Sequence, residues 1–127
     1  MAAETFFDYY YGDESTQFSF YRIPQKLITG KHFEHISVEA KLLYGLLLDR
    51  MGLSAKSGWY DETGRIYIYY TLEEIQENLN CRHDKAINLL VELDTKTGCG
   101  LIERVKQGQG RPTKIYVKRF ITGGRSL

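Results

Sequence analysis

The sequence predicts an α+β domain of the winged helix-turn-helix class, with a three-helix core, a β-hairpin wing and an additional hairpin. Three observations lead to this fold class. Three amphipathic segments have the apolar spacing of helices, and only a few residues separate the last two. A Gly/Pro turn near the C-terminus joins two alternating runs typical of strands. A similar strand-turn-strand pattern lies between the first two helical segments.

Length and composition fit one soluble globular domain. The chain has 127 residues, of which 43% are hydrophobic and 26% charged. We expect the domain to occupy 18–120, with an N-terminal arm at 1–17 and a flexible tail, or a linker to a further C-terminal domain, at 121–127. Neither a membrane span nor a signal peptide is evident. Two cysteines without a secretory signal indicate reduced thiols and a cytoplasmic protein.

The first 36 residues give weaker signals. Residues 1–17 mix acidic and aromatic side chains without a clear period, which fits either a mobile arm or a contact with a partner subunit. A dimer contact is favoured, because so many aromatic side chains are costly to leave in water. Residues 18–22 predict a short strand closed by Pro24. The stretch that follows predicts irregular chain or a short helical turn.

A strong helix is predicted from 38 to 51. Ser37 is a good N-cap, Glu39 is favourable in the first turn, and Gly52 predicts the end of the helix. The residues at helical spacing that we expect in the core are Val38, Leu42, Leu43, Leu46, Leu47 and Met51. A hairpin then follows, in which residues 59–60 and 65–70 flank the turn DETG and Gly64 supplies a left-handed conformation.

The next two helices and the last hairpin complete the motif. Thr71 and Glu74 form a capping-box pattern that opens the second helix, which ends at Asn80. The third helix is predicted from Arg82 to Asp94, with its core face around Ala86, Leu90 and Leu93. Two strands, LIERVKQ and TKIYVKRF, are joined by the turn GQGRP and form the predicted wing.

Charge is distributed unevenly along the chain. Residues 1–81 contain seven Lys/Arg and twelve Asp/Glu, whereas residues 82–119 contain nine Lys/Arg and four Asp/Glu. A basic segment next to an acidic one suggests a polyanionic partner for the basic part. The alternative is an ordinary solvated surface.

The third helix has the chemistry of a DNA-reading helix. Arg82, Lys85 and Asn88 are expected to project together from its first two turns, opposite the apolar face, and His83 lies beside them. Arg and Lys donate to guanine, and Asn pairs with adenine through two hydrogen bonds. The alternative is an amphipathic helix with a solvated polar face.

The wing strengthens this interpretation. Along the returning strand, Ile115 and Val117 are expected to face inward and Lys114 and Lys118 outward. A flexible basic tip suits contacts with phosphates or a narrow minor groove, although a surface hairpin kept soluble by lysines has a similar pattern. The wing residues we assign to DNA binding are Lys106, Gln107, Gln109, Arg111, Lys114 and Lys118.

No other chemistry stands out. His32 and His35 are three residues apart, and Cys81 lies close to His83, but neither pair has the further ligands that a metal site needs. Strand nicking by a tyrosine would also require a His-hydrophobic-His metal motif, which the sequence lacks. We therefore expect no metal, no cofactor and no enzymatic activity.

Four segments, FSFYRIP, AKLLYGLLLDRMGLS, GWYDETGRIYIYYTLEEIQENLNC and GLIERVKQGQGRPTKIYVKRF, together resemble the N-terminal domain of the RepA-N plasmid replication initiators. The resemblance covers about 5–120. It implies a winged helix that binds double-stranded DNA repeats in a replication origin, usually as a homodimer. It also implies that this origin lies inside the initiator's own coding sequence. It also implies host replication proteins as partners of a further C-terminal domain. It places the reading helix at Arg82–Leu93 and the wing at Lys106–Lys118.

This sequence departs from the family pattern at two places in the reading helix. Arg82 and His83 stand where the family often has Gly, and Asn88 stands where it often has Lys. These differences are expected to change which repeat is read. Two other functions share the predicted fold: a transcriptional repressor, and a protein-interaction winged helix that does not bind DNA. The basic third helix and wing argue against the latter.

Overall fold

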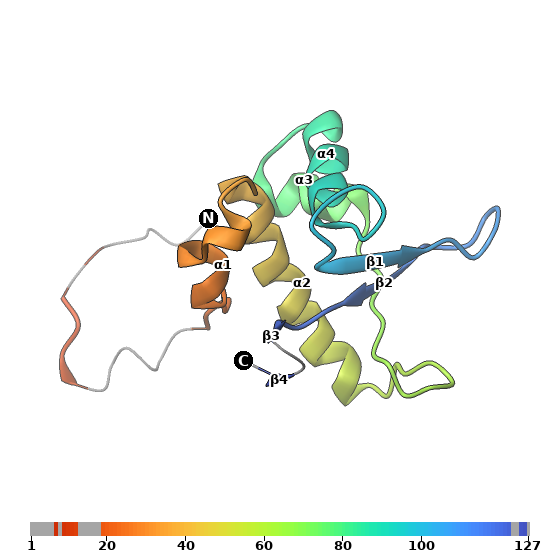
Figure 1. Ribbon diagram of the computed structural model, residues 1–127, viewed down its shortest axis with the longest axis horizontal. Coiled ribbons are helices and arrows are strands. Elements are labelled where there is room, and N and C mark those ends of the chain that lie inside the picture. The colour runs from red at the N-terminus through yellow and green to blue at the C-terminus, as the bar shows by residue number, and fades with distance from the viewer. Residues whose placement is uncertain (1–6, 8, 13–18, 123–124, 127) are drawn as a thin grey trace, which may run out of the picture.

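The computed structural model describes residues 7, 9–12, 19–122 and 125–126. Its elements are, in chain order, α1 (Gln25–Thr29), the 3-10 helix η2 (Lys31–Phe33), α2 (Val38–Lys56), α3 (Leu72–Leu79), α4 (His83–Leu93), β1 (Ile102–Val105), β2 (Lys114–Val117), β3 (Ile121–Thr122) and β4 (Arg125–Ser126). Helices α3 and α4 pack together against α2, and the β1–β2 hairpin projects away from them (Figure 1). This arrangement confirms the winged helix-turn-helix fold.

Helix α2 begins where the sequence predicts and ends later. The Ser37 hydroxyl accepts a hydrogen bond from the backbone N–H of Ala40 at 3.2 Å, as an N-cap should. The predicted end at Gly52 is wrong, because the helix continues to Lys56. Ser54 is buried in this last turn, and such packing outweighs the cost of about 1 kcal/mol for a helical glycine.

The turn between α3 and α4 follows the prediction closely. Thr71 and Glu74 form both hydrogen bonds of the capping box. Asn80 ends α3 in the left-handed conformation, with φ 52°, which asparagine tolerates better than most residues. Only residues 80–82 lie between the two helices, and Arg82 is the N-cap of α4. This short connection holds α4 across α3.

The wing is an antiparallel hairpin of β1 and β2. Its register pairs Ile102 with Val117 and Arg104 with Ile115. Ile115 also exchanges two backbone hydrogen bonds with Ile68, each 2.9 Å long, so the 66–69 segment lies beside β2. The 66–69 segment is therefore paired with the β2 edge of the hairpin, and the buried Ile68 and Ile115 join this edge to the core.

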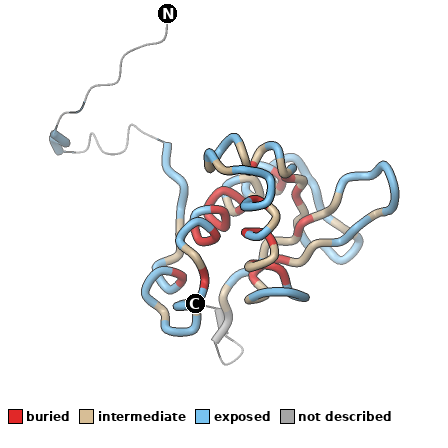
Figure 2. Tube along the Cα trace, turned by 90° about the horizontal axis from the view of Figure 1, so that it is seen from above, coloured by how far each residue is buried: buried red, intermediate tan, exposed pale blue. Residues whose placement is uncertain are grey.

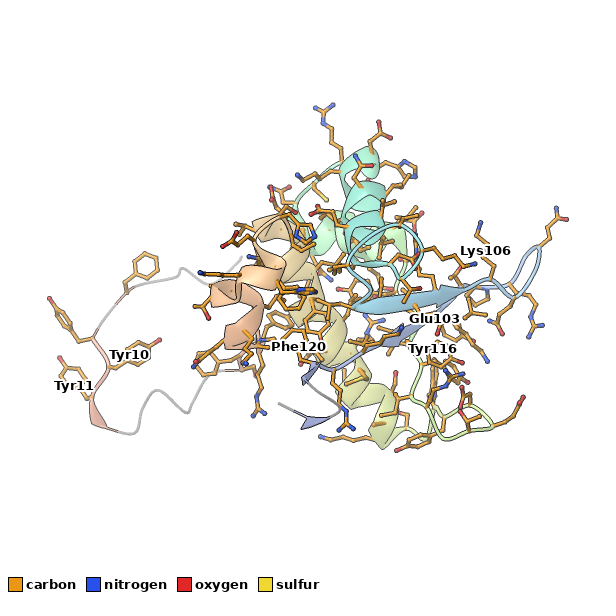
Figure 3. All side chains as sticks on the ribbon, in the orientation of Figure 1. Tyr10, Tyr11, Glu103, Lys106, Tyr116 and Phe120 are labelled. Carbon is orange, nitrogen blue, oxygen red and sulfur yellow. The ribbon has the colours of Figure 1, made fainter. Side chains whose placement is uncertain are left out.

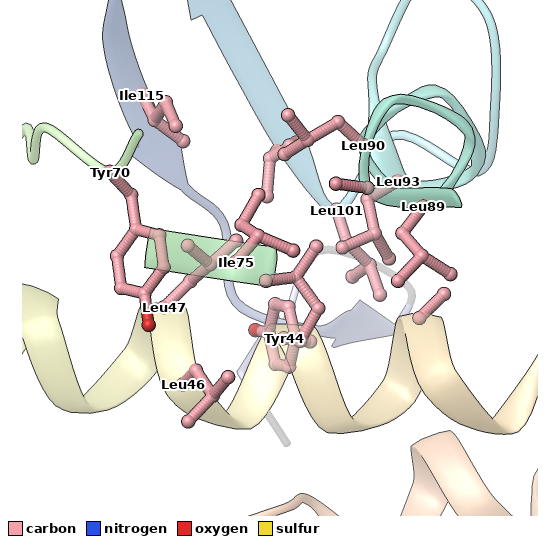
Figure 4. Close-up of a cluster of buried hydrophobic side chains, with 14 of the residues drawn as sticks. Tyr44, Leu46, Leu47, Tyr70, Ile75, Leu89, Leu90, Leu93, Leu101 and Ile115 are labelled. Atoms are coloured by element: carbon pink, nitrogen blue, oxygen red, sulfur yellow. The ribbon is translucent and has the colours of Figure 1, made fainter. Parts of the chain in front are cut away.

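The core forms where α2, α3, α4 and the base of the wing meet (Figure 4). Leu43, Leu46 and Leu47 of α2 are buried, as predicted. The expectation that Val38 and Leu42 are core residues is wrong: they remain 68% and 45% exposed. They lie on the flank of α2 that no described element covers. Figure 2 shows the buried positions concentrated along the helices and the base of the hairpin.

Two further predictions differ from the structure. Residues 19–22 form no strand, because none of the other described segments pairs with them; residue 18 lies outside the described residues. The hairpin predicted around the DETG turn is reduced to one bridge, Tyr60–Ile66, because Ile68 pairs with β2 instead. Gly64 does adopt the predicted positive φ, 88°. The tail contains β3 paired with β4.

The N-terminal arm falls largely outside the described residues. Of the acidic and aromatic stretch 1–17, the structure describes 7 and 9–12, and Phe7 is 95% exposed there. The dimer contact assigned to this arm stays a prediction. Among the described residues, no helix combines the length and apolar character needed to cross a membrane.

Candidate nucleic-acid interface

The N-terminal half of α4 forms an exposed ridge at the end of the domain opposite the hairpin base (Figure 1). Arg82, His83 and Asn88 are all exposed there, as the sequence predicts. Asp84 is also present on this outward face, with its side chain 99% exposed. Because Asp84 and Asn88 are four residues apart on the helix, their side chains lie one above the other. The buried residues Ala86, Leu89, Leu90 and Leu93 occupy the other side.

The remaining polar residues of α4 face α2 instead. Lys85 lies on that flank, with its Nζ 3.4 Å from Oε2 of Glu39. Glu92 accepts hydrogen bonds from Ser37, at 2.8 Å from the backbone N and 2.7 Å from Oγ. The predicted polar face of α4 is thus divided: Asn88 points outward, while Lys85 and Glu92 hold the first turn of α2.

The Glu39 carboxylate is held in its charged form. A hydrogen bond from its own backbone N–H, followed by the hydrogen bond and charge of Lys85, lowers the pKa of Glu39 below its ordinary value. Glu39 therefore carries a negative charge beside the exposed ridge at neutral pH.

A groove of about 860 Å³ separates α4 from the wing. Its walls come from α4, the loop after it, the start of α3 and the hairpin; polar and charged lining residues are Thr71, Asp94, Lys96, Thr97, Glu103, Arg104, Lys106 and Thr113. In Figure 3, Lys106 lies on the side of the hairpin from which α4 rises, and Tyr116 lies on the other side. Lys106 therefore faces the groove, as a DNA contact requires.

An ion pair forms the base of the groove. Arg104 Nε lies 2.6 Å from Oδ2 of the buried Asp94. Burial raises the pKa of Asp94, but the hydrogen bond from Arg104 and the backbone hydrogen bond from Lys96 outweigh burial, so the pKa lies below its ordinary value. Arg104 thus fixes β1 to the end of α4 and sets the angle between wing and helix.

The wing tip is exposed and built on two glycines. Gly108 and Gly110 have φ values of 113° and 77°, which side chains rarely permit. The predicted tip contacts Gln109 and Arg111 are both exposed. Gln107 has a different role, because its side-chain amide donates to the Pro112 carbonyl at 2.8 Å and to the Tyr69 hydroxyl at 3.3 Å. Gln107 therefore closes the base of the tip.

Two predicted wing residues lie away from the groove. Lys114 does face away from Ile115, as predicted, but this places its Nζ 4.4 Å from the centre of the Tyr67 ring, on the opposite face of the sheet. Lys118 follows the other end of β2, four residues and so about 13 Å beyond Lys114. The structure does not bring either residue together with the groove.

The loop after α4 contributes a residue that the sequence analysis did not assign to the site. Lys96 is exposed and lines the groove. The loop packs closely against α4. Thr97 Oγ1 donates a hydrogen bond to the Val91 carbonyl at 2.8 Å. A Cβ atom on Gly98 would lie 2.0 Å from the backbone carbonyl oxygen of Glu92. The available signal was a lysine three residues after the end of α4, the predicted reading helix. Across the described residues, no group of three or more His, Cys, Asp or Glu side chains is placed to hold a metal.

Comparisons with known proteins place this architecture in a family. Solved structures with the same fold include one described as the N-terminal domain of a DNA-binding protein, 30% identical, with a TM-score of 0.72 over 93% of this chain and 88% of that one. A Rep–DNA complex is 30% identical, with a TM-score of 0.67 over 94% and 89% of the two chains. A structure described as an MDR initiator is 30% identical, with a TM-score of 0.67 over 92% and 91%.

Sequence comparisons agree with the structural ones. A 41 kDa protein of Lactobacillus helveticus is 28% identical over 104 residues, which are 77% of this chain but 29% of that protein. This chain therefore spans less than a third of that relative. The pattern described as the N-terminus of replication initiator protein A (RepA) matches residues 19–126, which include α1 to β4. The chain therefore belongs to the family of replication initiator protein A (RepA) N-terminal domains.

Proposed function

We propose that this domain binds repeats in the double-stranded DNA of a plasmid or mobile-element replication origin, in a sequence-specific manner. The observation that carries the proposal is the exposed ridge of α4, with Arg82, His83 and Asn88, beside a groove whose far wall is a wing with a basic tip. The solved relative described as a Rep–DNA complex supports it, because this chain shares that fold at 30% identity.

The ridge has the size and chemistry of a major-groove reader. An α-helix fits the B-DNA major groove, which is about 12 Å wide. Arg82 has two donors for guanine, and Asn88 has a donor and an acceptor for adenine. The exposed carboxylate of Asp84 is an acceptor for the amino group of cytosine. These three side chains, from the first two turns of α4, are the proposed sequence readers.

The cations around the groove are proposed to hold the DNA backbone. Lys96 and Lys106 line the groove, and Arg111 lies at the exposed wing tip. With one or two contacts from the start of α4, these residues give roughly four to five phosphate contacts per subunit. Each contact releases about 0.9 counterion, so log K is expected to fall with log salt with a slope of about −4.

Assembly at the origin is part of the same proposal. Repeated sites suit a homodimer, in which each subunit places its own α4 on one half-site. Recruitment of host replication proteins is proposed to belong to regions outside this domain. The domain is proposed to mark the origin without performing chemistry.

The test is fluorescence anisotropy with duplex probes tiled along the chain's own coding sequence and the promoter region upstream of it, at two salt concentrations and with shuffled controls. Arg82→Ala/His83→Ala/Asn88→Ala should lose preferential binding to one tile. The matched control is Lys26→Ala/Lys31→Ala/His32→Ala, which removes exposed polar residues of α1 and η2 far from the groove.

The position of the preferred tile separates the candidate functions. A tile within the coding sequence supports origin recognition, whereas a tile at a promoter points to repression. Equal binding to all tiles, or no loss in the α4 variant, would contradict the proposal.

A further inference from the structure

The proposed reading helix carries a cation that is already paired within the protein. Lys85 Nζ lies 3.4 Å from Glu39 Oε2, and the two side chains are 44% and 51% exposed. Because Lys85 is three residues before Asn88, it lies at the edge of the exposed ridge of α4. The lysine is therefore within the proposed interface, but its charge is directed toward α2.

Glu39 is held firmly in this position. It lies in the first turn of α2, whose N-cap Ser37 makes two hydrogen bonds to Glu92 of α4. The negative charge is favourable there, because the N-terminus of a helix carries a partial positive charge. Glu39 therefore stays beside Lys85 as long as α2 and α4 remain packed together.

The Lys85–Glu39 ion pair contributes little to the stability of the fold, but it affects how Lys85 can contact DNA. Exposed ion pairs typically stabilise proteins by about 0.2–1 kcal/mol, so Lys85 is not required for the fold. A DNA phosphate approaching the edge of α4 is a second anion for the same ammonium group.

We infer that Glu39 is a specificity-determining residue of the DNA interface. Its ion pair with Lys85 prevents Lys85 from contacting the phosphates of loosely bound DNA. In a loose encounter with an arbitrary sequence, Lys85 stays paired with Glu39 and makes no phosphate contact. Close docking on the preferred sequence brings an acceptor near enough for Lys85 to leave Glu39. The acid thus lowers affinity for arbitrary DNA more than for the preferred site. This inference rests on the proposed function.

The test is Glu39→Gln, which removes the charge and keeps the shape. Binding to a shuffled duplex should tighten about 3- to 10-fold, and its log–log salt slope should steepen by about 0.9, the value for one added phosphate contact. Binding to the preferred tile should change less, so the ratio of the two affinities should fall. The control Asp49→Asn removes another exposed acid of α2 for which no contact with α4 is present among the described residues.

A second background tests whether Lys85 is the group involved. In Lys85→Ala, the substitution Glu39→Gln should have no larger effect than Asp49→Asn. An effect of Glu39→Gln that persists without Lys85, or an unchanged salt slope, would overturn the inference while leaving the proposed function intact. Failure of the wild-type domain to bind any duplex would overturn both, and urea unfolding of each variant checks that the fold is retained.

Discussion

Glu92, near the end of α4, accepts two hydrogen bonds from Ser37, the N-cap of α2, although the two residues are 55 positions apart in the sequence. The same Ser37 hydroxyl accepts the capping hydrogen bond from Ala40. One serine therefore both starts α2 and joins it to α4. Since α4 carries the proposed reading residues, this contact fixes their direction relative to the body of the domain.

Removing the Glu92 carboxylate should destabilise the domain. Hydrogen bonds to charged groups contribute about 1.5–3 kcal/mol each, and the two share one partner, so we expect Glu92→Ala to lower the free energy of unfolding by roughly 2–3 kcal/mol. Glu92→Gln should cost less, because its amide still accepts one bond. Urea unfolding measures this. The exposed Glu77→Ala is the comparison, and an equal effect of both would show that the Ser37 contact contributes nothing.

The ion pair at the base of the groove should make stability depend on pH in the acid range. The pKa of Asp94 is lowered from an ordinary value of 3.8. A group with a lowered folded-state pKa stabilises the fold above its unfolded pKa, and that contribution is lost as pH falls through the folded pKa. The stability difference between wild type and Asp94→Asn should therefore be constant above about pH 5 and shrink below about pH 4. A constant difference down to pH 2 would contradict the ion pair.

The wing should contribute to affinity for all DNA sequences alike. Lys106→Ala and Arg111→Ala should each weaken binding to preferred and shuffled duplexes by similar factors, and each should reduce the magnitude of the salt slope by about 1. Lys118→Ala is the internal control, because Lys118 lies at the other end of β2 from the tip. Salt titrations by anisotropy measure the slopes. An effect of Lys118→Ala as large as that of Arg111→Ala would mean that the DNA also contacts the end of the hairpin away from its tip.

Asn88 should act on sequence preference without affecting the fold. Its exposed side chain is not needed for packing, so Asn88→Ala should leave the urea midpoint unchanged. Loss of a bidentate base contact costs about 1–3 kcal/mol, which is roughly a 5- to 150-fold loss of affinity for the preferred tile. Affinity for shuffled duplex should hardly change. If Asn88→Ala weakened binding to the preferred and the shuffled duplex equally, Asn88 would contact the DNA backbone instead of a base.

The sequence predicted those parts of the site that depend on local pattern. The capping box of Thr71 and Glu74, the end of α3 at Asn80 and the exposure of Arg82 and Asn88 follow from neighbouring residues, and the structure has each of them. The ion pair of Lys85 could not be predicted in this way, because its partner Glu39 lies on another helix. Gln107 and Lys114 were likewise predicted as DNA contacts. In the structure, Gln107 donates a hydrogen bond to the Tyr69 hydroxyl, and the Lys114 ammonium group lies over the Tyr67 ring.

The sequence by itself determined the order of α2, α3, α4 and the wing, the starts of these three helices and the inward face of β2, because caps, turns and apolar periodicity act over a few residues. Only the tertiary structure decided where α2 ends, which strand partner Ile68 takes and which cations face the groove. These outcomes depend on contacts between residues far apart in the chain. Packing around Ser54 overrides the helix penalty of Gly52, and pairing with Ile115 replaces a local hairpin.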